Sequence, residues 1–336
     1  MHDETRSVQR VQLSYGKAIN AALSRALAEM PDTILYGEDL AKPGGVFGVT
    51  KNLQNEAGAV RVFDTPISET AMLGAAVGAA MCGLRPIVEI MWIDFSLVAM
   101  DQIVNQAANV RYVSAGRLAA PLTIRTQQGA TPGSCAQHSQ NLEAMFAHVP
   151  GLRVGLPATA QDAYSMLLAA IRSDDPTLII ENRGLYHGDE QSVAIDGPIE
   201  AVGGAHVARA GSDLTIVSWG AMLGRALEAA ALLEAQGVSV EVVNARWIAP
   251  FDWDTLLASV RRTGALMVVH EANLSGGFGA EIAARVQGAL FGQLRAPVER
   301  LGVADCRMPS APHLQAALIP DAADIARRAQ RLTRVM

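Results

Sequence analysis

The chain has 336 residues, of which 50% are hydrophobic and 18% are charged, and its formal net charge is −6. This length and apolar content suit two α/β domains with sizeable cores, and the acidic balance argues against a nucleic-acid-binding protein. No apolar run is long enough to cross a bilayer, the three cysteines form neither a disulfide framework nor a zinc motif, and the N-terminal string MHDETRSVQR is no secretory signal. We therefore expect a cytoplasmic protein with no membrane or nucleic-acid partner.

Strand-like and helix-like segments alternate through the first part of the chain, which predicts a parallel sheet with helices on both faces. The expected helices cover residues 15–30, 68–82, 95–113 and 160–172, and the expected strands cover residues 33–36, 61–63, 86–91, 121–126, 153–156 and 177–181. We expect these elements to form a first domain over residues 1–186.

A glycine-containing stretch over residues 187–210 is predicted to be an irregular connector. The alternation then restarts and predicts a smaller α/β domain over residues 211–336. Its expected strands cover residues 213–218, 239–245 and 265–270, and its expected helices cover residues 221–236, 254–262, 278–290 and 321–332. Continuously apolar strands such as LTIVS indicate a parallel sheet that is buried on both faces.

Glu69 is the first candidate for chemistry, because it opens the helix predicted after the turn at residues 64–66. Small residues follow at helical spacing and would let another helix approach closely. Spacing alone leaves two interpretations open. Ser68 is the N-cap and Glu69 only complements the helix dipole, or Glu69 is a partly desolvated functional acid.

Further candidates lie where predicted strands end. His138 follows a glycine-rich loop and precedes a helix, a position suited to an anionic or carbonyl substrate; a histidine that merely lines the loop is the alternative. Met91 and Phe95 lie where a strand passes into a helix, at the sheet edge that binds ligands in parallel sheets. Phe95 could stack on a planar ring there, with core packing as the alternative.

Taken in order, a set of strings resembles the β subunits of the thiamine-diphosphate-dependent decarboxylating component of 2-oxo acid dehydrogenase complexes over nearly the whole chain. The strings are GED (37–39), GGVFGVTKNL (44–53), RVFDTPISE (61–69), GAAVGAAMCGLRPIVEIM (74–91), DQIVNQAA (101–108), AQHSQ (136–140), FAHVPGLRV (146–154) and VVHEAN…GGFGAEIAA (268–284). The resemblance implies a transketolase-like pyrimidine-binding domain over residues 1–186 and a transketolase C-terminal domain over residues 211–336.

The resemblance also implies roles for single residues. Glu69 occupies the place of the family's catalytic glutamate, which hydrogen-bonds the aminopyrimidine of thiamine diphosphate and promotes loss of the cofactor's C2 proton. Phe95 falls at the position that stacks on the pyrimidine, and Met91 and Ile67 lie beside the same ring. His138 falls on the active-site histidine that handles the substrate carboxylate and transfer to the lipoyl group.

One motif of the family is missing from this sequence: the GDG followed by a spaced Asn that holds the diphosphate and Mg²⁺. In the family this motif lies on a separate α subunit. The resemblance thus implies a heterotetramer of two α and two β subunits, with Mg²⁺ ligands from the α subunit, no metal ligand in this chain, and a lipoyl acyltransferase as a further partner.

The strings DTPISE and QHSQ are typical of the pyruvate and acetoin branches. The sequence predicts oxidative decarboxylation of a small 2-oxo acid of the pyruvate type, with acyl transfer to a lipoyl group; an acetoin dehydrogenase β subunit is the alternative. A non-catalytic interaction subunit is disfavoured because Glu69, Phe95 and His138 are retained together. A dinucleotide-binding oxidoreductase is disfavoured because GGFG at residues 276–279 does not complete GxGxxG.

The chain departs from the family pattern near the expected site, at Thr70, Trp92, Ile93 and Val98, and these departures bear on the substrate more than on the cofactor. Some relatives bind potassium near the positions of Leu122, Ala170, Ser173 and Asp175, and only part of that pattern is present here. We make no prediction of a potassium site.

Overall fold

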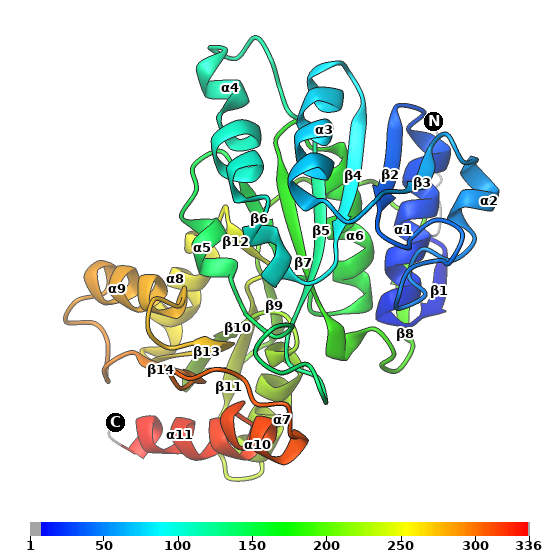
Figure 1. Ribbon diagram of the computed structural model, residues 1–336. Helices are drawn as coiled ribbons and strands as arrows, with labels where there is room; N and C mark the ends of the chain where they lie inside the picture. Colours follow the sequence, from blue (N-terminus) through cyan, green and yellow to red (C-terminus); the bar gives the residue numbers. More distant parts are fainter. Residues whose placement is uncertain (1–7, 335–336) are drawn as a thin grey trace, which may run out of the picture.

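The computed structural model describes residues 8–334, which form two α/β domains built on two separate sheets (Figure 1). The larger sheet has seven strands in the order β12-β6-β7-β5-β4-β2-β3. Its strands are β2 (Thr33–Gly37), β3 (Val62–Asp64), β4 (Arg85–Ile90), β5 (Thr123–Gln128), β6 (Arg153–Gly155), β7 (Thr177–Asn182) and β12 (Trp247–Ala249). All neighbours pair in parallel except β12, which is antiparallel to β6.

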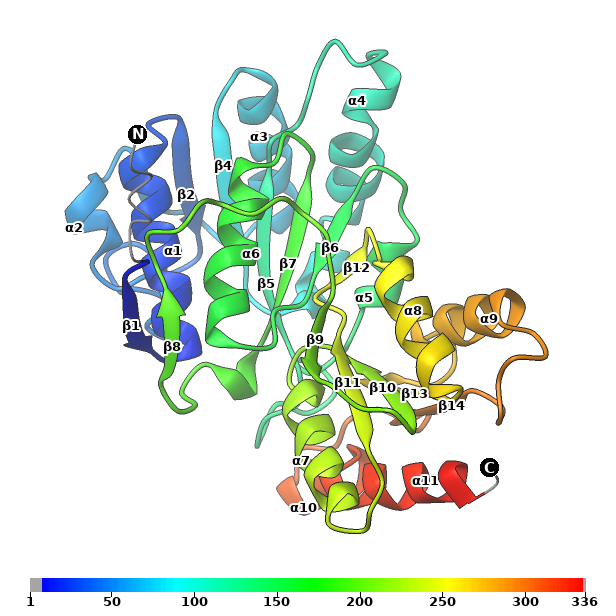
Figure 2. The same cartoon turned by 180° about the vertical axis from the view of Figure 1, so that it is seen from behind.

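Helices cover both faces of this sheet, as the alternating pattern predicts. The helices α1 (Tyr15–Glu29) and α6 (Ala160–Arg172) pack on one face, which Figure 2 shows from its own side. The helix α3 (Glu69–Met81) and the helical segment 93–113 pack on the other. A capping box at Thr159 and Asp162 fixes the start of α6, because each residue's side chain accepts a hydrogen bond from the other's backbone.

The segment 93–113 is helical but not the regular helix that was predicted. It consists of η1 (Ile93–Leu97), η2 (Gln102–Gln106), η3 (Ala107–Asn109) and α4 (Val110–Val113), of which η1 and η3 are 3₁₀ and η2 is a π turn. Apolar spacing indicates a helical backbone but does not distinguish these windings. The prediction of one regular helix is therefore wrong.

The second sheet has five strands in the order β14-β13-β10-β11-β9. They are β9 (His206–Arg209), β10 (Leu214–Ser218), β11 (Val240–Asn244), β13 (Leu266–Asn273) and β14 (Glu299–Val303), with only β9 antiparallel. The helices α7 (Met222–Glu234) and α11 (Ala322–Arg334) pack on one face, α8 (Trp253–Thr263) and α9 (Gly279–Ala289) pack on the other, and α10 (Pro312–Leu318) precedes α11. Two short helices, α2 (Leu53–Ala57) and α5 (Glu143–Ala147), complete the first domain.

The expectation that residues 187–210 are irregular throughout is wrong. The strand β8 (Gln191–Ala194), which follows the short turn η4 (Arg183–Leu185), pairs antiparallel with β1 (Arg10–Leu13), and β9 joins the second sheet. Val193 is the one fully buried residue of β8, so this strand lacks the alternation that marks a strand in a sequence.

The two domains share one apolar core. Ile103 and Phe146 from the first domain and Trp219 and Val268 from the second belong to the same buried cluster. The strand β12 also crosses from the second half of the chain into the first sheet. The domains are therefore joined by packing and by backbone pairing. No helix within residues 8–334 is long and apolar enough to span a membrane.

Candidate functional site

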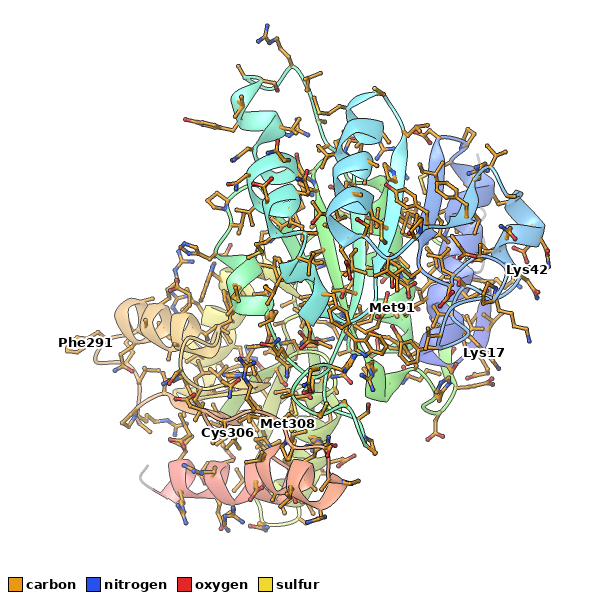
Figure 3. All side chains as sticks on the ribbon, in the orientation of Figure 1. Lys17, Lys42, Met91, Phe291, Cys306 and Met308 are labelled. Atoms are coloured by element: carbon orange, nitrogen blue, oxygen red, sulfur yellow. The ribbon has the colours of Figure 1, made fainter. Side chains whose placement is uncertain are left out.

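The residues selected from the sequence gather at one edge of the larger sheet. Glu69 follows β3, Met91 and Phe95 follow β4, and His138 follows β5. Because these strands are parallel, their carboxyl ends meet at the same edge, where such sheets bind ligands. Met91, labelled in Figure 3, lies directly after β4 and is half-buried.

An aromatic cluster joins two of the predicted residues. The ring centroids of Phe95 and His138 lie 5.5 Å apart at 83°, and Trp92 meets His138 at 4.6 Å and 75°. Trp92 also contacts Phe95 and Phe47 edge-on, each at 6.1 Å. Edge-to-face pairs are favoured because the positive edge of one ring meets the negative face of the other. Phe95 and His138, found in separate motifs, are thus neighbours in one wall.

Trp92 was noticed in the sequence only as a departure from the family, yet it is at the centre of this wall. Its backbone has a φ of 58°, unusual for a residue with a bulky side chain. Its backbone N–H donates to Gln127 Oε1 at 3.1 Å, and Gln127 Nε2 donates to Glu89 Oε1 at 3.2 Å. The indole N–H is buried and lacks a partner within residues 8–334. Such conformations persist where the surroundings hold them and cluster at functional sites.

Arg183 is a second member of the wall that no sequence motif indicates. It follows β7, and its Cζ lies 5.6 Å from the Trp92 ring centroid and 5.7 Å from that of Phe47. Nη1 donates to the His138 carbonyl at 3.1 Å and Nη2 donates to the Thr131 hydroxyl. Burial lowers the pKa of this guanidinium. Its place at the carboxyl end of a parallel strand was the only signal that could have identified it.

Glu69 is the first residue of α3 and is half-buried, and within residues 8–334 its carboxylate has no hydrogen-bond or ion-pair partner. Ser68 is at the N-cap position, but its side chain makes no capping hydrogen bond. Burial and the nearby Glu69 carboxylate raise the pKa of Glu38. Ile67 is 79% exposed. Glu69 could hydrogen-bond a ring nitrogen of a heteroaromatic ligand, while Ile67 offers an apolar contact to the face or a carbon edge of the same ring.

A side-chain contact connects Glu69's helix to the aromatic wall. Thr70 Oγ1 donates to the Val98 carbonyl at 2.8 Å, and Val98 directly follows η1, which contains Phe95. The start of α3 and the wall are therefore held at a fixed separation.

Behind the wall lies a fully buried ionic network. The Arg125 guanidinium binds Glu89 at 2.6 Å and Glu181 at 2.7 and 2.9 Å. Tyr186 Oη donates to Glu181 at 2.5 Å. Glu89 also accepts a hydrogen bond from Gln127 Nε2, and Gln127 Oε1 accepts one from the Trp92 backbone N–H. A buried network whose charges are paired fixes the groups attached to it.

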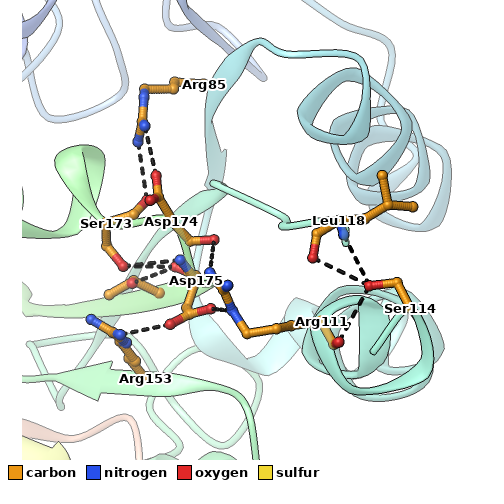
Figure 4. Close-up of polar contacts among 9 residues, drawn as sticks. Arg85, Arg111, Ser114, Leu118, Arg153, Ser173, Asp174 and Asp175 are labelled. Carbon is orange, nitrogen blue, oxygen red and sulfur yellow. Dashed lines mark hydrogen bonds and ion pairs between the residues drawn. The ribbon is translucent and has the colours of Figure 1, made fainter. Parts of the chain in front are cut away.

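Arginine side chains contact Ser173 and Asp175, two of the four positions noted above for potassium (Figure 4). Arg85 Nη1 donates to three carbonyls at the end of α6, and Nη2 donates to Asp174 at 2.7 Å. Asp175 lies between Arg111, at 2.5 Å, and Arg153, at 2.6 Å. Guanidinium groups thus already supply positive charge there. Within residues 8–334 no group of three or more His, Cys, Asp or Glu is arranged to hold a metal.

The two mainly parallel α/β domains are those of a transketolase-type protein, as comparison with family models shows. Residues 11–188 match the pyrimidine binding domain of transketolase, and residues 203–325 match the transketolase C-terminal domain. A solved structure described as a split gene transketolase, inactive beta4 tetramer, superposes with a TM-score of 0.79 at 25% identity, covering 97% of this chain and 99% of that one. The predicted fold class is confirmed.

Comparison with individual proteins identifies the subfamily within the transketolase-type proteins. The chain is 42% identical over 330 residues to the acetoin:2,6-dichlorophenolindophenol oxidoreductase subunit beta of Cupriavidus necator, covering 95% of this chain and 97% of the relative. It is also 42% identical over 324 residues to a mitochondrial pyruvate dehydrogenase E1 component subunit beta-2 of Oryza sativa, covering 95% and 86%. The chain belongs to the family of E1 β subunits of 2-oxo acid dehydrogenases, of the pyruvate dehydrogenase or acetoin type, and the resemblance seen in the sequence is confirmed.

Proposed function

We propose that this chain is the β half of a thiamine-diphosphate-dependent dehydrogenase that decarboxylates a small 2-oxo acid of the pyruvate type and passes the acyl group to a lipoyl group. The observation that carries the proposal is the wall of Phe95 and His138, linked through Thr70 and Val98 to the unpaired Glu69 carboxylate. Three free cysteines support a reducing, cytoplasmic setting.

In this proposal each residue has a separate task. When bound, thiamine diphosphate supplies the carbon nucleophile and the electron sink for decarboxylation. Glu69 holds a proton on a pyrimidine ring nitrogen, and Phe95 orients the ring by stacking, with Met91 and Ile67 beside it. His138 is placed to bind the substrate carboxylate and to move a proton during acyl transfer.

We propose that the rest of the site comes from an α subunit, in a heterotetramer of two α and two β subunits. The sequence lacks the GDG and spaced Asn of the family, so the Mg²⁺ ligands are assigned to the α subunit. The β-subunit designations of the relatives support this division. A lipoyl acyltransferase is the second partner.

The acetoin reaction is the second candidate, favoured by the match to the Cupriavidus necator subunit over nearly the full length of both chains. The test is to assay the chain, assembled with its α subunit, on pyruvate, branched 2-oxo acids and acetoin. We expect the highest kcat/KM for pyruvate. A preference for acetoin would replace the main proposal with the second candidate. Inactivity of a stable assembly on all three would favour the non-catalytic alternative.

A further inference from the structure

The loop that carries His138, residues 129–140, is held by side chains of both domains, and the second domain contacts it at several points. Glu271 Oε1 accepts a hydrogen bond from the Ala130 N–H at 2.9 Å, and Gln315 Nε2 donates to the Thr131 carbonyl at 3.0 Å. The Ser310 carbonyl accepts from the Gly133 N–H at 3.2 Å. We call this segment the His138 loop.

The far end of the His138 loop is held as well. Arg307 Nη1 donates to Gln140 Oε1 at 2.8 Å, and Gln140 Nε2 donates to Asp94 at 2.9 Å. Arg307 lies in the stretch between β14 and α10, where Cys306 and Met308 are labelled in Figure 3. Contacts from the second domain thus bracket His138 on both sides.

Glu271 also connects the loop to Arg183, the arginine of the wall. Its Oε2 accepts from Asn182 Nδ2 at 2.9 Å, and Asn182 Oδ1 accepts from the Gly184 N–H at 2.9 Å. Asn182 therefore fixes the turn that contains Arg183, whose guanidinium donates to the His138 carbonyl. One carboxylate at the end of β13 orients both the start of the loop and the arginine that holds its centre.

Gln315 is a second residue of the second domain that hydrogen-bonds the His138 loop. It is 5% exposed, and its amide nitrogen donates both to the Thr131 carbonyl and to the Pro309 carbonyl, at 2.8 Å. The Thr131 carbonyl also accepts from the Ser134 N–H at 2.9 Å, so Gln315 adds a second hydrogen bond that ties this turn of the loop to the second domain.

We propose that Glu271 and Gln315 are positioning residues of the second domain that hold the His138 loop, and so place His138 for acyl transfer. The inference builds on the proposed function, in which His138 contacts substrate. It gives the second domain a specific part in the reaction besides packing.

The substitution Glu271→Gln tests this with little change in shape. A glutamine can still accept from Ala130, but its amide NH₂ then faces the donor NH₂ of Asn182. Turning Asn182 over would satisfy that pair and lose the bond from Gly184. At least one hydrogen bond is therefore lost in every arrangement.

The second variant is Gln315→Met, which removes the hydrogen-bond donor and keeps a side chain of similar length. Glu299→Gln is the matched control, because Glu299 pairs on the surface of the same domain with Arg328.

The experiment measures kcat of the assembled complex and hydrogen–deuterium exchange of residues 129–140 in the full chain. We expect Glu271→Gln and Gln315→Met each to lower kcat by about tenfold, since small misplacement of a reacting group is costly. In a His138→Ala background the same changes should lower kcat by less than about twofold, because they act through His138. Exchange of the loop should rise in both variants, and Glu299→Gln should change neither quantity.

Equal losses of kcat in both backgrounds would overturn the proposal, and so would unchanged exchange of the loop in folded Glu271→Gln and Gln315→Met chains. If the wild-type complex turns over none of the candidate substrates, the proposed function fails, and the exchange measurement still decides whether the second domain holds the loop.

Discussion

The Glu69 carboxylate lies at the start of α3 without a hydrogen-bonding partner in residues 8–334. If it holds a proton on the pyrimidine, the isosteric Glu69→Gln removes that function while keeping the packing. We expect the C2 proton exchange of the cofactor bound to the assembled enzyme to slow by at least about 100-fold, as for loss of a general acid–base group. NMR of exchange into deuterated solvent measures it.

Glu56→Gln is the control for this change, because Glu56 lies in the separate helix α2 and accepts only a surface hydrogen bond from Ser24. Near-normal exchange in the Glu69→Gln enzyme would remove Glu69 from the mechanism.

His138 contacts the wall through its ring and Arg183 through its carbonyl. Because His138→Ala leaves the backbone contact in place, we expect turnover with lipoyl acceptor to fall by about 100-fold, with little change in cofactor affinity. Steady-state kinetics and calorimetry separate the two effects. His187→Ala, at an exposed position, should match wild type, and unchanged turnover in His138→Ala would show that the ring has no part in the chemistry.

His270 is expected to make the free energy of unfolding depend on pH. It is fully buried, stacks on Trp219 at 5.5 Å, and its Nε2 has no partner within the described residues. Burial lowers the pKa of His270 from 6.5 to about 4. The unfolded chain therefore binds a proton near pH 6.5 that the folded chain binds only near pH 4.

The contribution of His270 to the free energy of unfolding should be constant above pH 6.5 and fall as the pH drops towards 4, by up to about 3 kcal/mol. Burial raises the pKa of Glu143 and Glu271 and acts in the opposite direction. The free energy of unfolding in urea is therefore measured for wild type and for His270→Gln at several pH values between 4 and 6.5, and the difference between the two proteins isolates His270. Parallel curves for the two proteins would contradict the assignment.

Among the elements, α3 and η1 are joined by the hydrogen bond from Thr70 to the Val98 carbonyl. Thr70→Val keeps the β-branched shape and removes the donor. An exposed hydrogen bond contributes about 0.5–1 kcal/mol, so we expect cofactor affinity of the assembled enzyme to fall by roughly threefold. Calorimetric titration measures this, with Thr333→Val on α11 as the control, since that hydroxyl also donates to a backbone carbonyl. Equal affinity in wild type and Thr70→Val would mean that this contact does not set the site.

For the whole molecule, the missing diphosphate motif predicts half a cofactor site. We expect the isolated chain to show no measurable binding of thiamine diphosphate with Mg²⁺, and binding to appear when the α subunit is added. No metal-binding cluster lies within residues 8–334. Isothermal titration of the chain alone and of the assembly tests this, and tight binding by the chain alone would contradict a divided site.

The sequence by itself determined the alternation of strands and helices, because buried parallel strands and amphipathic helices leave regular apolar patterns. It also identified Glu69, Phe95 and His138 as candidates, because they lie in strings that recur in one family. It could not identify Trp92 or Arg183 as members of a wall, since no local pattern records which side chains meet at the edge of a sheet.

Only the tertiary structure decided how distant segments combine. The strand β12 pairs with β6 across almost 100 residues of chain, and Glu271 and Gln315 reach the His138 loop from the other domain. These contacts depend on long-range packing and on single polar atoms, which leave no periodic trace. The sequence therefore determined which residues are candidates for chemistry, and the fold decided what surrounds and holds them.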